Sequence, residues 1–564
     1  MSSEPGRTAL PALRPRTDIS PFEAVRLTGS LPITDLLTRE GGEIPVSGED
    51  RRIIAIFANG ITLVSKPERW SGRIKSILNM ARNAGHRVLD IVEVEASVIV
   101  TLYARAQDET NNGTAVLTEG VERQRELAKI LAKAAALSAS DIHLRVLRHA
   151  AEVRVRVFGR MMDLDFMNPE NGTALIKAAI AVSSDQGSAS SDLAFQQGAL
   201  TPGSGLLPKG VELIRLQYSP TSENRSALVM RLKYRSDPKD IEIDSLGYAD
   251  HHIRDIAVMR RRTSGIYLLS GKVSSGKSTT LQRTLNKMLI EKDREISMFI
   301  IEEPKELDIP GAIQVVAKPQ PDGTDGFSAG MWASLRSDPN VIVLGEIRTE
   351  RIAELAMEVI GSGHAVWSTI HAGSALGIMD RLIDLKVPVA DLTRPDLKGG
   401  LIYQRLCGVM CRNCRRDLAG ALQDKKISHE LAKGVLRLFE LPPEDIHLRG
   451  EGCEKCRGGL TGRTVVAETV EITAELLLLL RDGKREEMRR HWSSPVIEGG
   501  MGGLPVLHHA LAKVGAGICD INEVEEEVDL LSVYERDYAH LLPRLRQDVA
   551  ALRDNGRRPL NERT

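Results

Sequence analysis

An octapeptide near the middle of the chain has the residue types and the spacing of a phosphate-binding loop. Residues 271–278 read GKVSSGKS and fit the pattern G-x-x-x-x-G-K-[ST]. An apolar run (266–269) precedes the loop and a helix-like run (279–290) follows it, which is the strand–loop–helix setting that the pattern requires. In that setting, backbone N–H groups and the helix N-terminus point at phosphates. The sequence therefore predicts a nucleotide triphosphate site rather than a chance glycine-serine turn.

Two side chains of this loop would contact the nucleotide and its metal ion directly. Lys277 can reach the β- and γ-phosphates, and the hydroxyl of Ser278 can bind Mg²⁺. The expected nucleotide-binding residues are Gly271, Lys272, Val273, Ser274, Ser275, Gly276, Lys277, Ser278 and Thr279.

Acidic residues and a histidine follow three further apolar segments of the same region. Helical patterns alternate with these segments, which predicts an α/β fold with a mostly parallel sheet. Ligands bind at the carboxyl ends of such strands, so we expect Glu302, Glu346 and His371 to lie beside the loop. The expected strands are 296–301, 341–344 and 365–369, and the expected helices are 327–337 and 352–360.

Length and composition limit the class of protein. A chain of 564 residues is too long for one core and should hold three or four domains. Hydrophobic residues at 42% and charged residues at 27% are typical of soluble globular proteins. The net charge of -1 predicts no direct nucleic-acid partner. Because no apolar run is long enough to span a membrane and the N-terminus lacks the apolar core of a signal peptide, we expect a cytoplasmic protein.

Four of the six cysteines form two C-x-x-C pairs, Cys411 with Cys414 and Cys453 with Cys456. Each pair can present two thiolates to a tetrahedral ion, so the sequence predicts a zinc site. A redox dithiol is the alternative, but no thioredoxin-like pattern surrounds either pair. The remaining cysteines, Cys407 and Cys519, are expected to be packed thiols.

The N-terminal part of the chain carries no catalytic signature. Residues 1–30 are rich in Pro, Arg and Ser and are expected to be disordered. Residues 31–103 predict a small α/β docking domain, and 104–117 a linker. Within that domain we expect a hairpin at Asn59 and Gly60, a helix at 73–84 and further strands at 88–92 and 97–102.

Residues 118–236 predict a second α/β domain that begins with a helix at 118–137. A strand at 153–157 alternates valine with arginine, which puts the valines on one face and Arg154 and Arg156 on the other. Two such arginines usually form a solvated face. The remaining expected parts are an ATPase domain at 237–400, a C-terminal region with the cysteines at 401–530 and a charged helical tail at 531–564.

The order of these motifs resembles the secretion ATPases that assemble type IV pili and power type II secretion. The resemblance runs from Ser138 to about Asp529 and is specific because it includes many motifs in a fixed order. Besides the phosphate loop, the matching segments are SASDIHL (138–144), IEEPKE (301–306), the Walker B segment SDPNVIVLGEIR (337–348), the histidine box GHAVWSTIHA (363–372), QRLCGVMCRNC (404–414) and GCEKCRGGLTGR (452–463).

The resemblance implies a fold and a machine. A RecA-like ATPase domain would follow a PAS-like domain and an N-terminal domain, with a zinc-binding, helix-rich C-terminal region. The protein would be a cytoplasmic homohexamer, attached to the inner membrane through a platform protein, that hydrolyses ATP with Mg²⁺. The zinc region and the N-terminal domain are similar to assembly and export members rather than to retraction ATPases.

The resemblance also implies roles for the site residues. Ser278 and, through water, Glu346 would hold Mg²⁺, because Gly345 stands where a generic Walker B segment has Asp. Glu306 would orient the attacking water, with Glu302 and Glu303 in support. His371 would sense the γ-phosphate, and its alternative is a satisfied polar loop residue. Arg154 and Arg156 would act as charge donors to the nucleotide of a neighbouring subunit.

The sequence departs from the family pattern at several positions, which indicates a divergent branch such as a conjugative thin-pilus system. The departures are Lys272, Val273 and Ser274 for Pro, Thr and Gly, Glu303 for Asp, Phe158 where Asp is usual, and Trp332 for an arginine that would pair with Arg336. Two other functions stay open. One is a DNA translocase or conjugation-type ATPase, which the net charge disfavours. The other is a nucleotide-binding scaffold that hydrolyses too slowly to do work.

Overall fold

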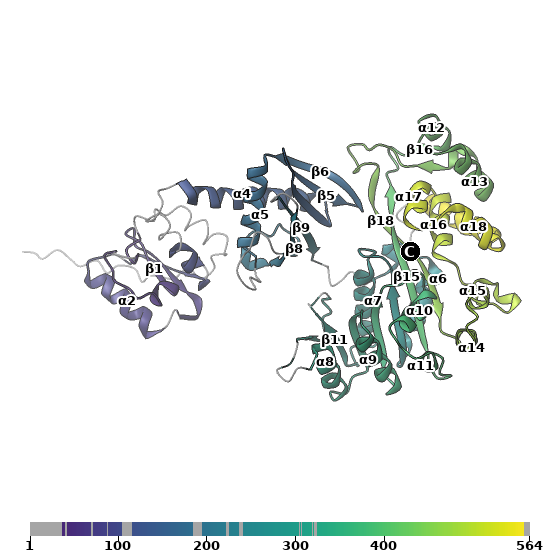
Figure 1. Cartoon of the computed structure of the whole chain (residues 1–564), viewed down its shortest axis with the longest axis horizontal. Coiled ribbons are helices and arrows are strands. Elements are labelled where there is room, and N and C mark those ends of the chain that lie inside the picture. Colours follow the sequence, from purple (N-terminus) through teal and green to yellow (C-terminus); the bar gives the residue numbers. More distant parts are fainter. Residues whose placement is uncertain are drawn as a thin grey trace, which may run out of the picture. The chain divides into compact units, whose positions relative to one another are not determined.

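The chain divides into two compact units, Met1–Arg235 and Ser236–Thr564 (Figure 1). The computed structural model describes residues 36–39, 42–68, 71–86, 88–96, 98–103, 115–183, 195–221, 225–235, 241–303, 305, 307–318, 320 and 324–557. The expected disordered segment 1–30, most of the expected linker 104–117 and Glu306 lie outside these ranges. Among the described helices, none has the length and apolar character that crossing a membrane requires.

A three-stranded sheet in the first unit forms around the expected hairpin. β1 (Ile54–Ile56) pairs antiparallel with β2 (Ile61–Ser65), and Gly60 in the turn has a φ of 90°. β3 (Asp90–Val94) adds parallel to β2, and α2 (Gly72–Asn83) covers the sheet with Ile74, Ile77 and Leu78.

The expected strand at 97–102 is wrong, because residues 98–103 are helical. The side chains that this segment buries against the sheet, Ile99, Leu102 and Tyr103, have the spacing of one helix face. The Tyr103 hydroxyl fixes the helix by donating to the carbonyl oxygen of Ile54 at 2.9 Å.

The first unit also contains a six-stranded antiparallel sheet, with strand order β6-β5-β4-β9-β8-β7. Helices α4 (Ala115–Ala136) and α5 (Pro169–Ala181) bury their apolar side chains in the core of this sheet. The alternation on β5 is confirmed, since Val153, Val155 and Val157 are buried and the arginines between them are not. The strands are β4 (Asp141–Val146), β5 (Ala151–Val157), β6 (Arg160–Met167), β7 (Gln196–Leu200), β8 (Val211–Thr221) and β9 (Arg225–Tyr234).

A seven-stranded sheet is the centre of the second unit, with strand order β12-β11-β13-β14-β10-β15-β18. Every neighbouring pair in it is parallel except β15 and β18, so the mostly parallel sheet expected from the sequence is confirmed. The strands are β10 (Gly265–Ser270), β11 (Met298–Glu302), β12 (Ile313–Val316), β13 (Val341–Ile347), β14 (Ala365–Ile370), β15 (Gly399–Met410) and β18 (Leu460–Glu471).

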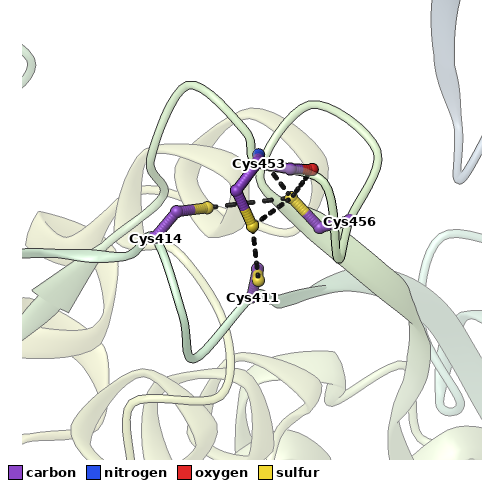
Figure 2. Close-up of side chains that lie close together, drawn as sticks. All are labelled: Cys411, Cys414, Cys453 and Cys456. Carbon is purple, nitrogen blue, oxygen red and sulfur yellow. Dashed lines mark hydrogen bonds between the residues drawn. The ribbon is translucent and has the colours of Figure 1, made fainter.

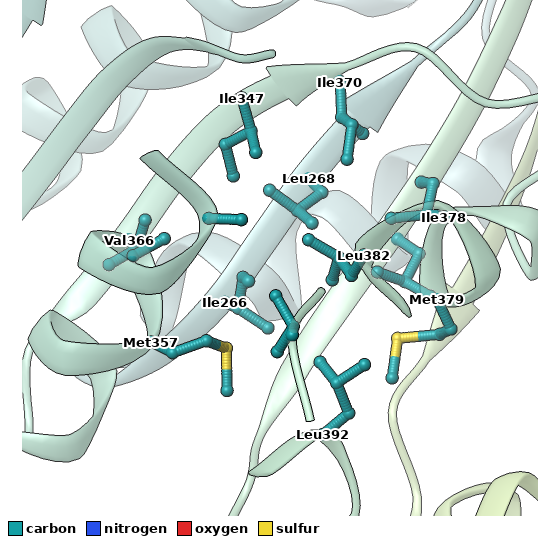
Figure 3. Close-up of a cluster of buried hydrophobic side chains, with 14 of the residues drawn as sticks. Ile266, Leu268, Ile347, Met357, Val366, Ile370, Ile378, Met379, Leu382 and Leu392 are labelled. Carbon is teal, nitrogen blue, oxygen red and sulfur yellow. The ribbon is translucent and has the colours of Figure 1, made fainter. Parts of the chain in front are cut away.

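Helices cover both faces of this sheet, which explains why its central strands are apolar without alternation. On β10, Ile266 and Leu268 enter one apolar cluster, while Tyr267 and Leu269 enter the other. Figure 3 shows the first cluster, in which side chains of the sheet meet those of α9 and α10. The first cluster includes α8 (Gly326–Leu335), α9 (Glu350–Gly361), α10 (Gly377–Asp384), α11 (Val389–Leu392), α14 (Ala474–Arg481) and α15 (Arg485–Ser493), and the second α6 (Asp250–Arg261) and α7 (Lys277–Glu291).

The C-terminal region is continuous with the same sheet. β15 and β18 pair over their length, so the border expected at residue 400 runs through the sheet rather than between two bodies. The expected helical tail folds back, and its Leu545 and Val549 are buried in a third core. That core holds α12 (Leu418–Gln423), α13 (His429–Phe439), α16 (Val506–Gly515), α17 (Ile521–Glu527), α18 (Leu531–Asp537) and α19 (Leu542–Arg557), beside the short strands β16 (Arg416–Asp417) and β17 (His447–Leu448).

Two histidines are buried where α6 and α16 meet β18. The rings of His252 and His509 lie 4.8 Å apart, and Nδ1 of His509 accepts the backbone N–H of Ala467 at 3.1 Å. Burial lowers the pKa of both histidines well below the usual value, and burial also lowers the pKa of the neighbouring His251 to about 4. These rings are therefore neutral in the folded protein at neutral pH.

We expect the second unit to lose stability as the pH falls below neutral. Above pH 6.5 both states hold neutral histidines, whereas below it only the unfolded state takes up these protons. Between pH 7.5 and 5.5, each of His252 and His509 should lower the free energy of unfolding by about 1 kcal/mol. Denaturant unfolding at the two pH values measures the loss, and His509→Gln should reduce it by about one histidine's share. If wild type and variant lose the same free energy of unfolding, His509 is not a source of the pH dependence.

Candidate active site

The phosphate loop lies between β10 and α7, at the carboxyl edge of the parallel sheet. Gly271 and Gly276 have φ values of 153° and 84°, and a Cβ on Gly271 would overlap the carbonyl oxygen of Gln404. Ser274 also has a positive φ, of 62°, at the position where the family pattern favours glycine. The loop thus keeps a left-handed residue there, at a cost of about 1 kcal/mol for the serine side chain.

Lys277 lies across the loop, and its ammonium donates to the carbonyl oxygens of Gly271 at 2.8 Å and Lys272 at 3.2 Å. Ser278 and Thr279 follow in the first turn of α7, and both are exposed. The loop therefore presents an ammonium, a hydroxyl and the N-terminus of a 15-residue helix from one place. The ammonium and the helix N–H groups fit the phosphates of a nucleotide, and the hydroxyl oxygen fits a magnesium ion.

Glu346 is at the end of β13 and is held from two sides. Nε2 of His371, just after β14, lies 2.9 Å from its Oε1, and the Arg348 guanidinium lies 2.7 Å from its Oε2. Ser270 at the end of β10 accepts the N–H of Ala372 at 2.7 Å, which ties the histidine segment to the strand that leads into the loop. The structure thus brings Glu346 and His371 together at the edge that carries the phosphate loop.

Glu302 packs against Gly345, which stands at the Walker B position where aspartate is usual. Its side chain is buried at the end of β11, and both oxygens accept the N–H of Leu307, at 3.3 and 3.2 Å. A Cβ on Gly345 would lie 3.1 Å from Cγ of Glu302. An aspartate at 345 would therefore press against Glu302, so the buried glutamate fills the space that the missing side chain leaves.

Two of the remaining predicted loop residues differ in their surroundings. Val273 is 64% exposed, whereas Nζ of Lys272 lies 3.6 Å from a carboxylate oxygen of Glu527 in α17. An exposed pair of this kind contributes little to stability. Two buried side chains for which the sequence predicts no role at the site, Gln404 and Tyr248, also belong to the loop's surroundings. The signal in the sequence that could have pointed to Gln404 is a polar glutamine in a largely apolar strand.

Arg154 and Arg156 both have partners within their own sheet. Nε of Arg154 lies 2.8 Å from Asp163 on β6, and Nη1 of Arg156 donates to the carbonyl oxygen of Gly159 at 2.8 Å. Arg154 keeps 31% of its side chain exposed, so its ion pair is weak enough to exchange for another anion. That the two arginines donate charge to a neighbouring subunit's nucleotide stays a prediction.

The four cysteines of the two C-x-x-C pairs lie together (Figure 2). Their sulfur atoms are 3.8 Å apart between Cys411 and Cys453, and 3.7 Å apart both between Cys414 and Cys456 and between Cys453 and Cys456. Zinc–sulfur bonds of about 2.3 Å in a tetrahedron require sulfur atoms about 3.8 Å apart. A disulfide needs about 2.05 Å. The spacing therefore fits a zinc ion.

Strand pairing brings the two cysteine turns together across the residues that separate them. β15 ends at Met410, opposite Leu460 on β18, and the N–H of Cys411 donates to Gly459 at 2.8 Å. The backbone N–H of Lys455, followed by the amide of Asn413, lowers the pKa of Cys453 to about 7. Hydrogen bonds of this kind favour the thiolate that a zinc ion binds.

Cys407 and Cys519 lie in the C-terminal core and not in this cluster. Hydrogen bonding to Cys519 is the main cause that raises the pKa of Cys407 well above its usual value, and burial adds to it. Cys407 is therefore not poised to be a thiolate ligand.

We expect one zinc ion per chain, bound by Cys411, Cys414, Cys453 and Cys456. Metal analysis of protein purified without added zinc should find one equivalent, and replacing these four cysteines by serine should remove it, because the thiolates supply the binding energy. A Cys407→Ala, Cys519→Ala variant is the matched control and should keep its zinc. Stoichiometric zinc in the quadruple-serine protein would overturn the assignment.

Comparison with known proteins places these features in a family. The chain matches the family described as type II/IV secretion system protein over residues 119–526. Type II secretion system protein E of Dickeya dadantii is 30% identical over 360 residues, which cover 63% of this chain and 67% of that protein. The type IV pilus assembly ATPase PilB of Thermus thermophilus is 27% identical over 431 residues, or 75% of this chain and 46% of that protein.

Among solved structures, the Legionella pneumophila ATPase DotB superposes on 71% of this chain and 94% of its own, with a TM-score of 0.46 and 17% identity. The family match is the stronger finding, because it includes the phosphate loop, the strand-end residues and the cysteine cluster. Since the match extends over more than half of the sequence, the chain belongs to the type II/IV secretion system protein family.

Proposed function

We propose that the chain is an ATPase motor that hydrolyses ATP to drive the assembly of a type IV pilus or of a type II secretion pseudopilus. The family match supports this function, as do relatives named for type II secretion and for type IV pilus assembly. The observation that carries it is the Glu346–His371 pair, which lies at the same sheet edge as the phosphate loop. A conjugative thin pilus is one fibre that such a motor would build.

The proposal includes a role for each of several site residues. Lys277 and the loop N–H groups would bind the phosphates in place of the carbonyl contacts that the lysine now makes. Ser278 would bind Mg²⁺ directly and Glu346 through water. A bound Mg²⁺ would neutralise charge that develops on the phosphate oxygens. His371 can exchange the carboxylate of Glu346 for a γ-phosphate oxygen and so sense the nucleotide.

Further parts of the proposal come from the family. The phosphate-loop unit would be RecA-like, and the six-stranded sheet would be part of a PAS-like domain. Six chains would form a ring in which Arg154 and Arg156 reach a neighbour's nucleotide, while Glu306 orients the attacking water. The ring would work in the cytoplasm on an inner-membrane platform protein. Zinc would be structural, since four protein thiols leave no open coordination position.

The first test is ATP hydrolysis by purified protein with Mg²⁺. Lys277→Ala should abolish turnover by impairing nucleotide binding, and Glu346→Gln should abolish turnover while nucleotide still binds. Lys292→Ala, at the other end of α7, is the matched control and should hydrolyse ATP like the wild type. Wild-type rates in either of the first two variants would refute the assignment.

The second test asks whether the arginines act between subunits. One inactive protein carries Lys277→Ala, and the other carries Arg154→Ala with Arg156→Ala. If the arginines act in trans, about a quarter of the sites in a randomly mixed ring would combine an intact loop with intact arginines, so activity should return. Each variant alone is the control. A mixture that exchanges subunits and stays inactive would count against trans donation.

A further inference from the structure

Gln404 approaches the phosphate loop from the neighbouring strand and is fully buried. It lies on β15, which pairs with β10, and its Nε2 donates to the carbonyl oxygen of Ser275 at 2.7 Å. Both glycines of the loop pattern face this residue. A Cβ on Gly271 would overlap the Gln404 carbonyl oxygen, and a Cβ on Gly276 would lie 3.3 Å from Nε2. The close fit of loop and strand therefore centres on Gln404.

The bond to Ser275 sets the direction of a phosphate donor. In a trans peptide the C=O and the N–H point in opposite directions. Because Gln404 draws the Ser275 carbonyl towards β15, the N–H of Gly276 must point away from that strand. Backbone N–H groups of this loop are the donors that a phosphate uses. Gln404 thus holds one of them in its binding direction.

Tyr248 decides which end of the Gln404 amide faces the loop. A glutamine amide has a donor end and an acceptor end, and the reversed orientation would set its oxygen against the Ser275 carbonyl. The Tyr248 hydroxyl donates to Oε1 of Gln404 at 2.5 Å, which leaves Nε2 for Ser275. Burial raises the pKa of Tyr248, so the hydroxyl keeps the proton that it donates. It also lies 3.2 Å from Oγ1 of Thr280 in the first turn of α7.

The segment that carries Tyr248 is itself fastened to α7. The Arg283 guanidinium donates to the Glu242 carbonyl oxygen at 2.7 Å and to the Ser245 hydroxyl at 2.5 Å. Lys287, one turn further along the helix, pairs with the Glu242 carboxylate. Residues 242–248, here called the strap, therefore hold Tyr248 in a fixed position against the helix that follows the loop.

We infer that Gln404 and Tyr248 are positioning residues for nucleotide binding, which act by orienting the Ser275–Gly276 peptide and do not touch the nucleotide. The inference rests on the nucleotide site proposed above. It goes beyond that site because it gives a role to two residues from distant segments that meet behind the loop.

The test compares nucleotide affinity with stability. Titration calorimetry with Mg²⁺-ADP should give a dissociation constant about tenfold higher for Tyr248→Phe than for the wild type, because the amide loses its orienting donor. Gln404→Glu should bind Mg²⁺-ADP more weakly still, since a carboxylate cannot donate a hydrogen bond to the carbonyl oxygen of Ser275. Tyr267→Phe is the matched control. It removes a hydroxyl bond from a buried tyrosine on β10, to Ser264, and should bind Mg²⁺-ADP like the wild type.

Melting temperatures of the nucleotide-free proteins separate positioning from general loss of structure. Tyr248→Phe should melt close to Tyr267→Phe and yet bind Mg²⁺-ADP more weakly. If Lys277→Ala binds Mg²⁺-ADP as the wild type does, the proposed nucleotide site fails and this inference fails with it. If Lys277→Ala loses binding while Tyr248→Phe and Gln404→Glu keep wild-type affinity, the inference alone is overturned.

Discussion

The second unit depends on the close pairing of β15 with β10. Two glycines begin β15, and a Cβ on Gly399 would overlap the carbonyl oxygen of Ile266, while one on Gly400 would meet Met259 of α6. Because glycine has no side chain at these two positions, β15 can pair closely with β10, the strand that leads into the phosphate loop. The same strand then carries Gln404 behind the loop and ends beside Cys411. One strand thus joins the nucleotide site and the cysteine cluster.

The sequence predicted the parts of the site that follow local patterns. The phosphate loop, the apolar strands and the two cysteine turns each have their residues within a few positions of one another. Parallel strand ends meet at one edge, so the position of Glu346 and His371 beside the loop also followed from the pattern. The helix at 98–103 was missed because a short apolar run fits either period.

Contacts between distant segments could not be predicted in this way. Gln404 and Ser275 are 129 positions apart, and Gln404 and Tyr248 are 156 apart, so no local spacing connects them. Two residues differ from the expected patterns, Ser274 from the glycine of the family and Gly345 from the aspartate of a generic Walker B segment. In the structure, Ser274 adopts the left-handed conformation of the glycine that it replaces, and Glu302 packs where a side chain at 345 would lie. The backbone of the loop is thus kept at 274, and a neighbouring side chain packs against Gly345.

The strap, residues 242–248, is connected by hydrogen bonds both to α7 and to the phosphate loop. The two units divide at Ser236, and residues 242–248 come soon afterwards in the sequence. These residues are bound to Arg283 and Lys287 of α7. They also contact the loop peptide, because Tyr248 donates to Gln404 and Gln404 donates to Ser275. A displacement of the strap would therefore act on α7 and on a phosphate donor at once. The position of the strap and the affinity for nucleotide would then be coupled, so that a change in either one would alter the other.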